Sequence, residues 1–198
     1  MPRVKQRTEA LHERGLASAM AVLAEEGVAG LTTRTVAHRA RASLPAIYEV
    51  FGDKAGIVRE IFFEGFRLLG EELAALPPTA DALEALRHLA EAFRLFLLEH
   101  PMLADVMFSR PFADFDPTQN EGKAGAKVRK IFVQHVRNAV DAGDFDGDPT
   151  DIALVFFTLV EGLAAAENAQ RLGGSKQSAN RRFQLGVDTL IDGFTRGN

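Results

Sequence analysis

The sequence contains no cysteine among its 198 residues, so disulfide bonds, thiol redox sensing and cysteine-ligated zinc are excluded. Tryptophan is also absent and tyrosine occurs once, whereas phenylalanine occurs 15 times. The longest apolar run, residues 152–160, is far shorter than the roughly 20 residues that span a bilayer. No apolar segment follows the basic N-terminus, as a signal peptide would require. We therefore expect a soluble, cytoplasmic protein with no membrane partner.

The sequence signatures of enzymes and metal sites are missing as well. Residues 173–176 (Gly-Gly-Ser-Lys) lack the glycine spacing and the preceding strand of a phosphate-binding loop, and neither Gly-x-Ser-x-Gly nor His-Glu-x-x-His occurs. Asp144, Asp146 and Asp148 alternate as in a calcium loop, but Val155 occupies the position that requires a bidentate glutamate. We interpret this segment as a solvated turn in which Asp148 caps the next helix. The sequence predicts no enzyme activity, no cofactor and no metal site.

Residues 32–54 predict two short helices joined by a tight turn. Thr32 can cap the first helix, Ser43 can cap the second, and Pro45 falls in the first turn of the second, where its missing amide hydrogen costs little. Apolar residues give each helix one inner side: Val36, Ala37 and Ala40 in the first, and Leu44, Ile47, Tyr48 and Phe51 in the second. This pattern is typical of a helix-turn-helix, which indicates sequence-specific DNA binding.

A helix-turn-helix reads DNA with the exposed face and N-terminal turn of its second helix. Small apolar side chains there can contact a thymine methyl, Glu49 can accept a hydrogen bond from a cytosine amino group, and Tyr48 and Lys54 can reach phosphates. The candidate DNA-binding residues are Thr33, Arg34, Arg41, Ser43, Leu44, Ala46, Tyr48, Glu49 and Lys54.

Four short motifs occur together between residues 10 and 54: Ser18-Ala19…Leu23…Gly27, Thr32-x-Arg34-x-Val36-Ala37, Ala40-x-x-Ser43, and Ile47-Tyr48-x-x-Phe51-x-x-Lys54. Together they resemble the DNA-binding domain of the tetracycline-repressor-like (TetR) family. The resemblance implies an all-α fold of about nine helices and a homodimer. It also implies that an N-terminal domain binds double-stranded operator DNA and a C-terminal domain binds an effector. We place the two domains at residues 1–54 and 55–198.

The resemblance further implies that Tyr48 and Lys54 contact phosphate and that Thr33, Leu44 and Ala46 lie at or near the groove. Three residues depart from the family pattern. Arg41 replaces the usual glycine of the turn, which predicts either backbone strain or a different turn, and offers an extra phosphate contact. Thr35 stands where Asp or Glu is common, so we expect no reciprocal capping box. Glu49 occupies a position that is often basic.

Charge is divided unevenly along the chain, whose formal net charge is −4. Residues 1–54 carry eight Lys or Arg against six Asp or Glu, whereas the remainder carries 15 against 21. A modest basic excess therefore coincides with the expected DNA-binding segment. Because the excess is small, and because of Arg41 and Glu49, a helical ligand-binding or scaffold protein without specific DNA recognition stays open as an alternative.

The C-terminal segment predicts long helices with broad apolar faces. Residues 152–171 are apolar on nearly the whole helical circumference, which predicts burial on both sides, and residues 183–194 repeat the pattern. Apolar surfaces of this size favour a homodimer. We expect a repressor that a small apolar effector releases from a palindromic operator. His135 is either a hydrogen-bonded core histidine or a ligand contact. Glu161 is either a partly exposed residue at the dimer interface or a polar anchor in an apolar effector pocket. The candidate effector-binding residues are Phe93, Phe96, Met107, Phe108, His135, Phe157 and Glu161.

Overall fold

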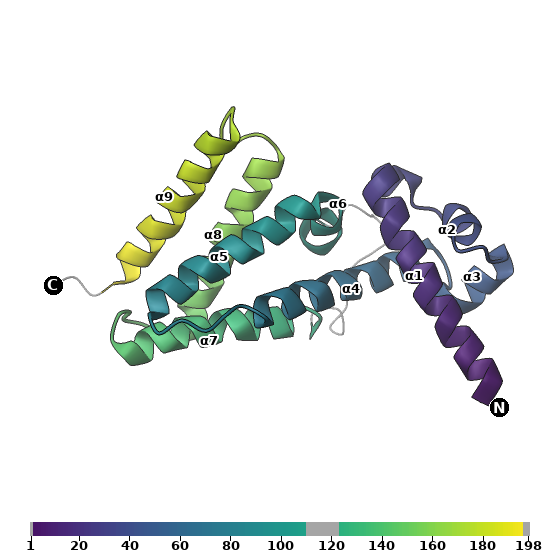
Figure 1. Cartoon of the computed structure of the whole chain (residues 1–198), viewed down its shortest axis with the longest axis horizontal. Coiled ribbons are helices and arrows are strands. Elements are labelled where there is room, and N and C mark those ends of the chain that lie inside the picture. The colour runs from purple at the N-terminus through teal and green to yellow at the C-terminus, as the bar shows by residue number, and fades with distance from the viewer. Residues whose placement is uncertain (1, 110–122, 196–198) are drawn as a thin grey trace. The chain divides into compact units, whose positions relative to one another are not determined.

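The computed structural model describes residues 2–109 and 123–195, apart from the side chains of residues 2–7 (Figure 1). These residues form nine α-helices and one π-helical turn, and they contain no β-strand. The predicted all-α fold is confirmed. The helices are α1 (Pro2–Gly30), α2 (Thr33–Arg39), α3 (Leu44–Phe51), α4 (Lys54–Ala74), α5 (Ala82–Glu99), α6 (Pro101–Ala104), the π-helical turn η1 (Asp105–Ser109), α7 (Ala126–Ala142), α8 (Pro149–Asn168) and α9 (Lys176–Phe194).

The chain divides into two compact units. The first comprises Met1–Arg67 and His100–Ala124, and the second comprises Leu68–Glu99 and Gly125–Asn198. Helix α4 therefore contributes its first turns to one unit and its last turns to the other. The first unit contains α1, α2 and α3, and the second contains α5, α7, α8 and α9.

Aromatic stacking and one polar contact connect α1 to α3 and α4. His12 of α1 stacks on Phe51 of α3, with ring centroids 5.2 Å apart, and its Nε2 lies 3.1 Å from a carboxylate oxygen of Glu60 on α4. Gly15 allows α1 to approach closely, since a Cβ atom there would lie 2.5 Å from Cε2 of Phe51. Helix α1 also contains a break at Gly27, where φ is 67°, a conformation that glycine adopts without strain. These contacts fix α3 against α1 and α4.

The start of α2 corrects one expectation from the sequence. The Thr32 hydroxyl accepts the Thr35 N–H at 3.1 Å, and the Thr35 hydroxyl accepts the Thr32 N–H at 3.0 Å. A reciprocal capping box is thus present, and the prediction of its absence was wrong. The reason is that a threonine hydroxyl oxygen can accept as a carboxylate does. Its hydrogen is in turn donated to the Gly30 carbonyl at 2.8 Å.

Three phenylalanine rings form the centre of the second unit. Phe93 of α5, Phe132 of α7 and Phe157 of α8 have pairwise centroid separations of 5.5, 5.1 and 5.2 Å. Two of the three contacts are edge-to-face, the geometry that the ring quadrupole favours. Each ring comes from a different helix, so the cluster sets the packing of α5, α7 and α8.

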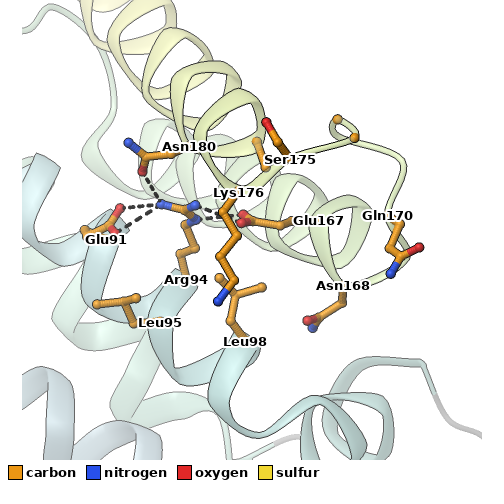
Figure 2. A pocket seen from close by; sticks show the side chains of 13 residues that line it. Glu91, Arg94, Leu95, Leu98, Glu167, Asn168, Gln170, Ser175, Lys176 and Asn180 are labelled. Carbon is orange, nitrogen blue, oxygen red and sulfur yellow. Dashed lines mark hydrogen bonds and ion pairs between the residues drawn. The ribbon is translucent and has the colours of Figure 1, made fainter.

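A buried arginine joins α5 to the hairpin that α8 and α9 form (Figures 1 and 2). Arg94 is only 5% exposed. It donates to both carboxylate oxygens of Glu167 at 2.8 and 2.9 Å, to Glu91 at 3.1 Å, and to the Asn180 side-chain oxygen at 2.8 Å. Its guanidinium carbon also lies 4.6 Å from the centre of the Phe183 ring. The hydrogen bond to Glu167 raises the pKa of Arg94, which therefore stays charged.

Helix α8 exposes one apolar side within a single chain. It ends at Asn168 rather than at residue 171, and Leu154 and Val155 are 61% and 49% exposed. The helices of the second unit cover the face of Ile152, Phe156 and Val160. Burial of the other side, which would require a second copy of the chain, stays a prediction. Helix α8 is long enough and apolar enough to cross a membrane: its most apolar 18-residue segment has a mean hydropathy of 1.5. Of that segment, 28% is buried within the structure. A single helix of this length and hydropathy is weak evidence for a membrane span, because core helices of soluble proteins can share both properties.

Replacing Arg94 with leucine should destabilise the protein strongly. We expect the free energy of unfolding to fall by about 3–5 kcal/mol, because the Glu167 carboxylate would remain buried without its partner. The matched control is Arg87→Leu on the same helix, where Arg87 and Asp188 form a 2.8 Å ion pair and are 40% and 46% exposed. Urea denaturation should show a loss within about 1 kcal/mol for this control. Equal losses in the two variants would contradict the role given to Arg94.

Candidate nucleic-acid interface

The turn between α2 and α3 is closed by two backbone hydrogen bonds. The Arg41 N–H donates to the His38 carbonyl at 3.1 Å, and the Ala42 N–H donates to the Ala37 carbonyl at 3.0 Å. This is the Schellman arrangement that ends many helices, and it places Arg41 in the left-handed region with a φ of 50°. For a residue with a Cβ atom this conformation costs about 1–2 kcal/mol. Of the two outcomes that the sequence left open, the structure therefore shows backbone strain at Arg41.

Helix α3 begins as the sequence predicted. The Ser43 hydroxyl accepts the Ala46 N–H at 3.4 Å, and Pro45 lies in the first turn. Ile47 and Phe51 are buried, and Leu44 is half-buried. Tyr48, which the sequence placed in the same apolar stripe, is 48% exposed. The buried stripe is thus narrower than predicted. The outer side of α3 combines half-buried Leu44 and Ala46 with exposed Tyr48 and Glu49.

Two hydroxyl groups meet between α2 and α3. The Thr33 hydroxyl donates to the Tyr48 hydroxyl oxygen across 3.4 Å. Since the tyrosine oxygen accepts in this contact, its own hydrogen remains available to a second partner. The structure thus brings together two of the residues that the sequence selected, although they are 15 positions apart.

Lys54 is the first residue of α4 and is exposed. The preceding residue, Asp53, accepts the Gly56 N–H at 3.0 Å and so caps the helix. Lys54 therefore follows directly on the turn that ends α3 at Gly52. The short connection keeps this cation close in the chain to the exposed side of α3.

The other two basic residues that the sequence selected, Arg34 and Arg41, line a hollow of about 600 Å³ beside α2. His38 and Arg39, which are not among the candidates predicted from the sequence, line the hollow too. For His38 a signal was present, because residues 34 and 38 are four positions apart on α2 and therefore lie on one helical face. The remaining lining residues are Val22 and Glu26 of α1, and Thr35. Arg39 donates twice to Glu25 of α1, with the Nη1 bond at 2.6 Å.

The candidate effector residues do not form one described group. Phe93 and Phe157 belong to the ring cluster of the second unit, and Phe96 is also buried there. Met107 and Phe108 belong to the first unit, where the Phe108 ring packs 5.5 Å from that of Phe66. Within residues 2–109 and 123–195, no group of three or more His, Asp or Glu could hold a metal ion.

The two polar candidates on α7 and α8 differ in their surroundings. His135 is half-buried, and its Nδ1 lies 2.9 Å from the Ile131 carbonyl one turn earlier. This contact fits the interpretation of a hydrogen-bonded core histidine. Glu161 lies one turn after Phe157 on α8 and is also half-buried, and this burial raises the pKa of its carboxyl group. Burial thus disfavours the charged form of Glu161.

Helices α2 and α3 are joined by a turn of defined geometry, and a long helix and a second helical unit follow them. This arrangement defines a helix-turn-helix DNA-binding protein with a C-terminal helical domain. A model of the bacterial regulatory proteins of the tetR family matches residues 16–61, and a model of the tetracyclin repressor-like C-terminal domain matches residues 86–190. The chain belongs to the TetR family, whose members are transcription regulators and not enzymes.

Solved structures agree with this assignment. A protein of unknown function from Rhodococcus sp. RHA1 is 28% identical, with a TM-score of 0.81 over 94% of this chain and 96% of the other. A TetR variant from Acinetobacter baumannii AYE in complex with minocycline is 22% identical, with a TM-score of 0.63 over 90% and 93% of the two chains. At that identity the likeness shows the fold alone. A comparison with curated proteins finds no match.

Glu161→Gln should make stability less dependent on pH. The folded-state pKa of Glu161 is raised by burial, so the folded protein holds this proton to a higher pH than the unfolded chain does. Wild-type stability should therefore fall as the pH rises from about 4.3, the ordinary value, through the raised pKa. Thermal melts across this range should show equal stability at low pH and a more stable variant at neutral pH. A difference that does not change with pH would refute the expectation.

Proposed function

We propose that this regulator is a repressor that binds a palindromic operator as a homodimer and leaves it when a small apolar effector binds. Residues 1–54 would carry the DNA contacts, and residues 55–198 the effector site and the dimer interface. The observation that carries the DNA-binding part is the Thr33–Tyr48 contact on the exposed side of α2 and α3. It prepares a tyrosine hydroxyl to donate to a phosphate beside the helix that enters the major groove.

The side chains around this contact suit different parts of a DNA duplex. Leu44 and Ala46 offer apolar surface to a thymine methyl group, and Glu49 can accept from a cytosine amino group. Tyr48 and Lys54 suit phosphates, which fix the register of the protein on the duplex without reading its sequence. In this proposal α3 supplies the specificity and the residues beside it supply most of the affinity.

The homodimer is supported by apolar surface on α8 and α9. Leu154 and Val155 of α8 and Leu185 of α9 are among the most exposed large apolar residues that the structure describes, at 61%, 49% and 65%. The two helices pack together as a hairpin (Figure 1). A two-fold interface uses the same surface on both copies. Packing one hairpin against the same hairpin of a second copy would therefore cover these side chains on both copies.

The effector part of the proposal is supported by one relative and by one residue. The Acinetobacter baumannii protein is solved in complex with minocycline, a small molecule. In this chain Glu161 is a half-buried acid one turn from Phe157, and a polar group in apolar surroundings can orient a ligand. A compound library screened for release of the protein from its DNA tests this step directly.

Changes at Tyr48 and Lys54 should separate two kinds of phosphate contact. Lys54→Ala should weaken DNA binding and reduce the log–log salt slope by about 0.9 per subunit, because the lost cation no longer displaces a counterion. Tyr48→Phe should weaken binding by about tenfold or more, as expected for a hydrogen bond to a charged group, and should leave the slope unchanged. Both can be measured by fluorescence anisotropy against a duplex that the protein itself selects from a random library.

The controls are thermal melts of both variants and binding to a scrambled duplex. Unchanged melting temperatures would show that the losses arise at the DNA. If the wild-type protein bound selected and scrambled duplexes equally and weakly, specific DNA recognition would be rejected in favour of a helical ligand-binding protein.

Leu185→Glu should disrupt the homodimer. A charge in the centre of a closed apolar interface is costly, so sedimentation should show a shift from dimer to monomer while the circular dichroism of the helices is retained. Leu95→Glu on α5, where the leucine is 43% exposed, is the matched control and should remain dimeric. A monomeric wild-type protein, or equal behaviour of the two variants, would contradict the proposed interface.

A further inference from the structure

We propose that a hollow at one end of the α8–α9 hairpin binds a small zwitterion, with an apolar body and opposite charges at its two ends. An apolar amino acid or a short apolar peptide has this chemistry. We call the space the hairpin hollow. No residue assigned above to the DNA contacts, the effector site or the dimer interface lines it. The inference is therefore independent of the proposed function and goes beyond it.

The hairpin hollow lies within the second unit and has a volume of about 830 Å³. Sites for small molecules typically measure roughly 300–1,000 Å³, so its size suits such a ligand. Three parts of the chain meet there: α5, the end of α8 with the loop that follows it, and the start of α9 (Figure 2).

The Arg94 cluster forms one wall of the hairpin hollow and fixes its shape. Arg94 bonds to Glu91 of its own helix, to Glu167 of α8 and to Asn180 of α9, and all four side chains line the hollow. Directional bonds thus hold all three helices at this wall, which exists before a ligand arrives. A preformed wall lowers the cost of ordering the site when a ligand binds.

This wall carries a net negative charge, because one guanidinium is shared by two carboxylates. The Glu91 side chain is 34% exposed and that of Glu167 is 14% exposed, so Glu91 is the more accessible acid. Its carboxylate accepts hydrogen bonds from Arg94 through both oxygens and one from the Gln184 amide. A carboxylate has about four acceptor sites, so Glu91 can accept a further bond from an ammonium group.

Lys176 supplies the remaining charge of the lining. It is exposed and forms no ion pair with any residue that the structure describes. In Figure 2 its side chain extends from α9 toward the α5 side of the hairpin hollow. The lysine balances the excess charge of the Arg94 cluster, so the lining favours neither a net cation nor a net anion. A ligand that carries both charges complements both groups.

Two leucines of α5 provide the apolar part of the lining. Leu95 is 43% exposed and Leu98 is half-buried, and both line the hairpin hollow. With Glu91 they follow the spacing i, i+4 and i+7, which places all three on one face of α5. This face runs from a carboxylate to apolar surface over about 10 Å. An ammonium group at Glu91, an apolar body over the leucines and a carboxylate at Lys176 match this order.

Isothermal titration calorimetry of the full-length protein with four forms of a leucine dipeptide tests the proposal. At pH 7 the free peptide carries both charges, the C-terminal amide only the positive one, the N-acetylated peptide only the negative one, and the doubly blocked peptide neither. Each free end should tighten binding by about two- to fivefold, as partly exposed ion pairs do. The free peptide should therefore bind most tightly. Free leucine, titrated alongside, shows whether an amino acid or a peptide is the better source of these ends.

Two variants assign the charged ends to their partners. Lys176→Gln should abolish the advantage of a free carboxylate and keep that of a free amine. Glu91→Gln should do the reverse, and its amide oxygen can still accept from Arg94. The matched control is Arg181→Gln, which removes an exposed cation of α9 that does not line the hairpin hollow and should leave all affinities unchanged. Thermal melts check that each variant is folded, and the lysine variant decides the matter if Glu91→Gln is not.

Four results would overturn the proposal: no binding of any form at millimolar concentration, equal affinities for the four forms, tighter binding of a blocked peptide than of the free one, or equal effects of Lys176→Gln and Arg181→Gln. No DNA enters this assay. Failure here would therefore leave the proposed DNA binding intact, and failure to select a DNA sequence would leave the hairpin hollow intact.

Discussion

The Schellman turn at the end of α2 is the constraint on which the DNA-binding arrangement depends. Its two backbone hydrogen bonds, from Arg41 and Ala42, fix where α3 starts relative to α2. That geometry brings Tyr48 to Thr33 and leaves the outer side of α3 exposed. The stacking of His12 on Phe51 then holds the far end of α3 against α1. A change in the turn would therefore move every residue proposed to touch DNA.

In the second unit, α8 and α9 form a hairpin that is packed on one side and leaves apolar residues exposed on the other. Burial alone cannot fix this hairpin, because α8 exposes Leu154 and Val155. The Arg94 cluster supplies the missing restraint from the inner side: one guanidinium binds Glu167 at the end of α8 and Asn180 near the start of α9 (Figure 2). Directional bonds at that end of the hairpin define its geometry without using its outer apolar surface.

Local features could be predicted from the sequence because their partners are a few residues apart. Thr32, Ser43 and Asp148 cap helices as predicted. The capping interaction of Thr35 differs from the prediction because a threonine hydroxyl accepts the Thr32 N–H as the carboxylate common at this position would. The hollow beside α2 and the bonds of Arg94 depend on helices that meet only after folding, with Arg94 and Glu167 separated by 73 positions. No local pattern contains that information.

The charges of the first unit show how a protein of net charge −4 can still bind a polyanion. The recognition helix itself presents no cation, and its exposed Glu49 is repelled by phosphates, so that residue is tolerated only over the groove and away from the backbone. In the proposed complex, apolar contacts from Leu44 and Ala46 would contribute selectivity but little long-range attraction. In the proposed complex the attraction would come from cations beside α3, namely Lys54, Arg34 and Arg41. Because Arg39 is paired with Glu25, Arg34 and Arg41, which are both exposed, are the arginines of this segment that would orient the duplex.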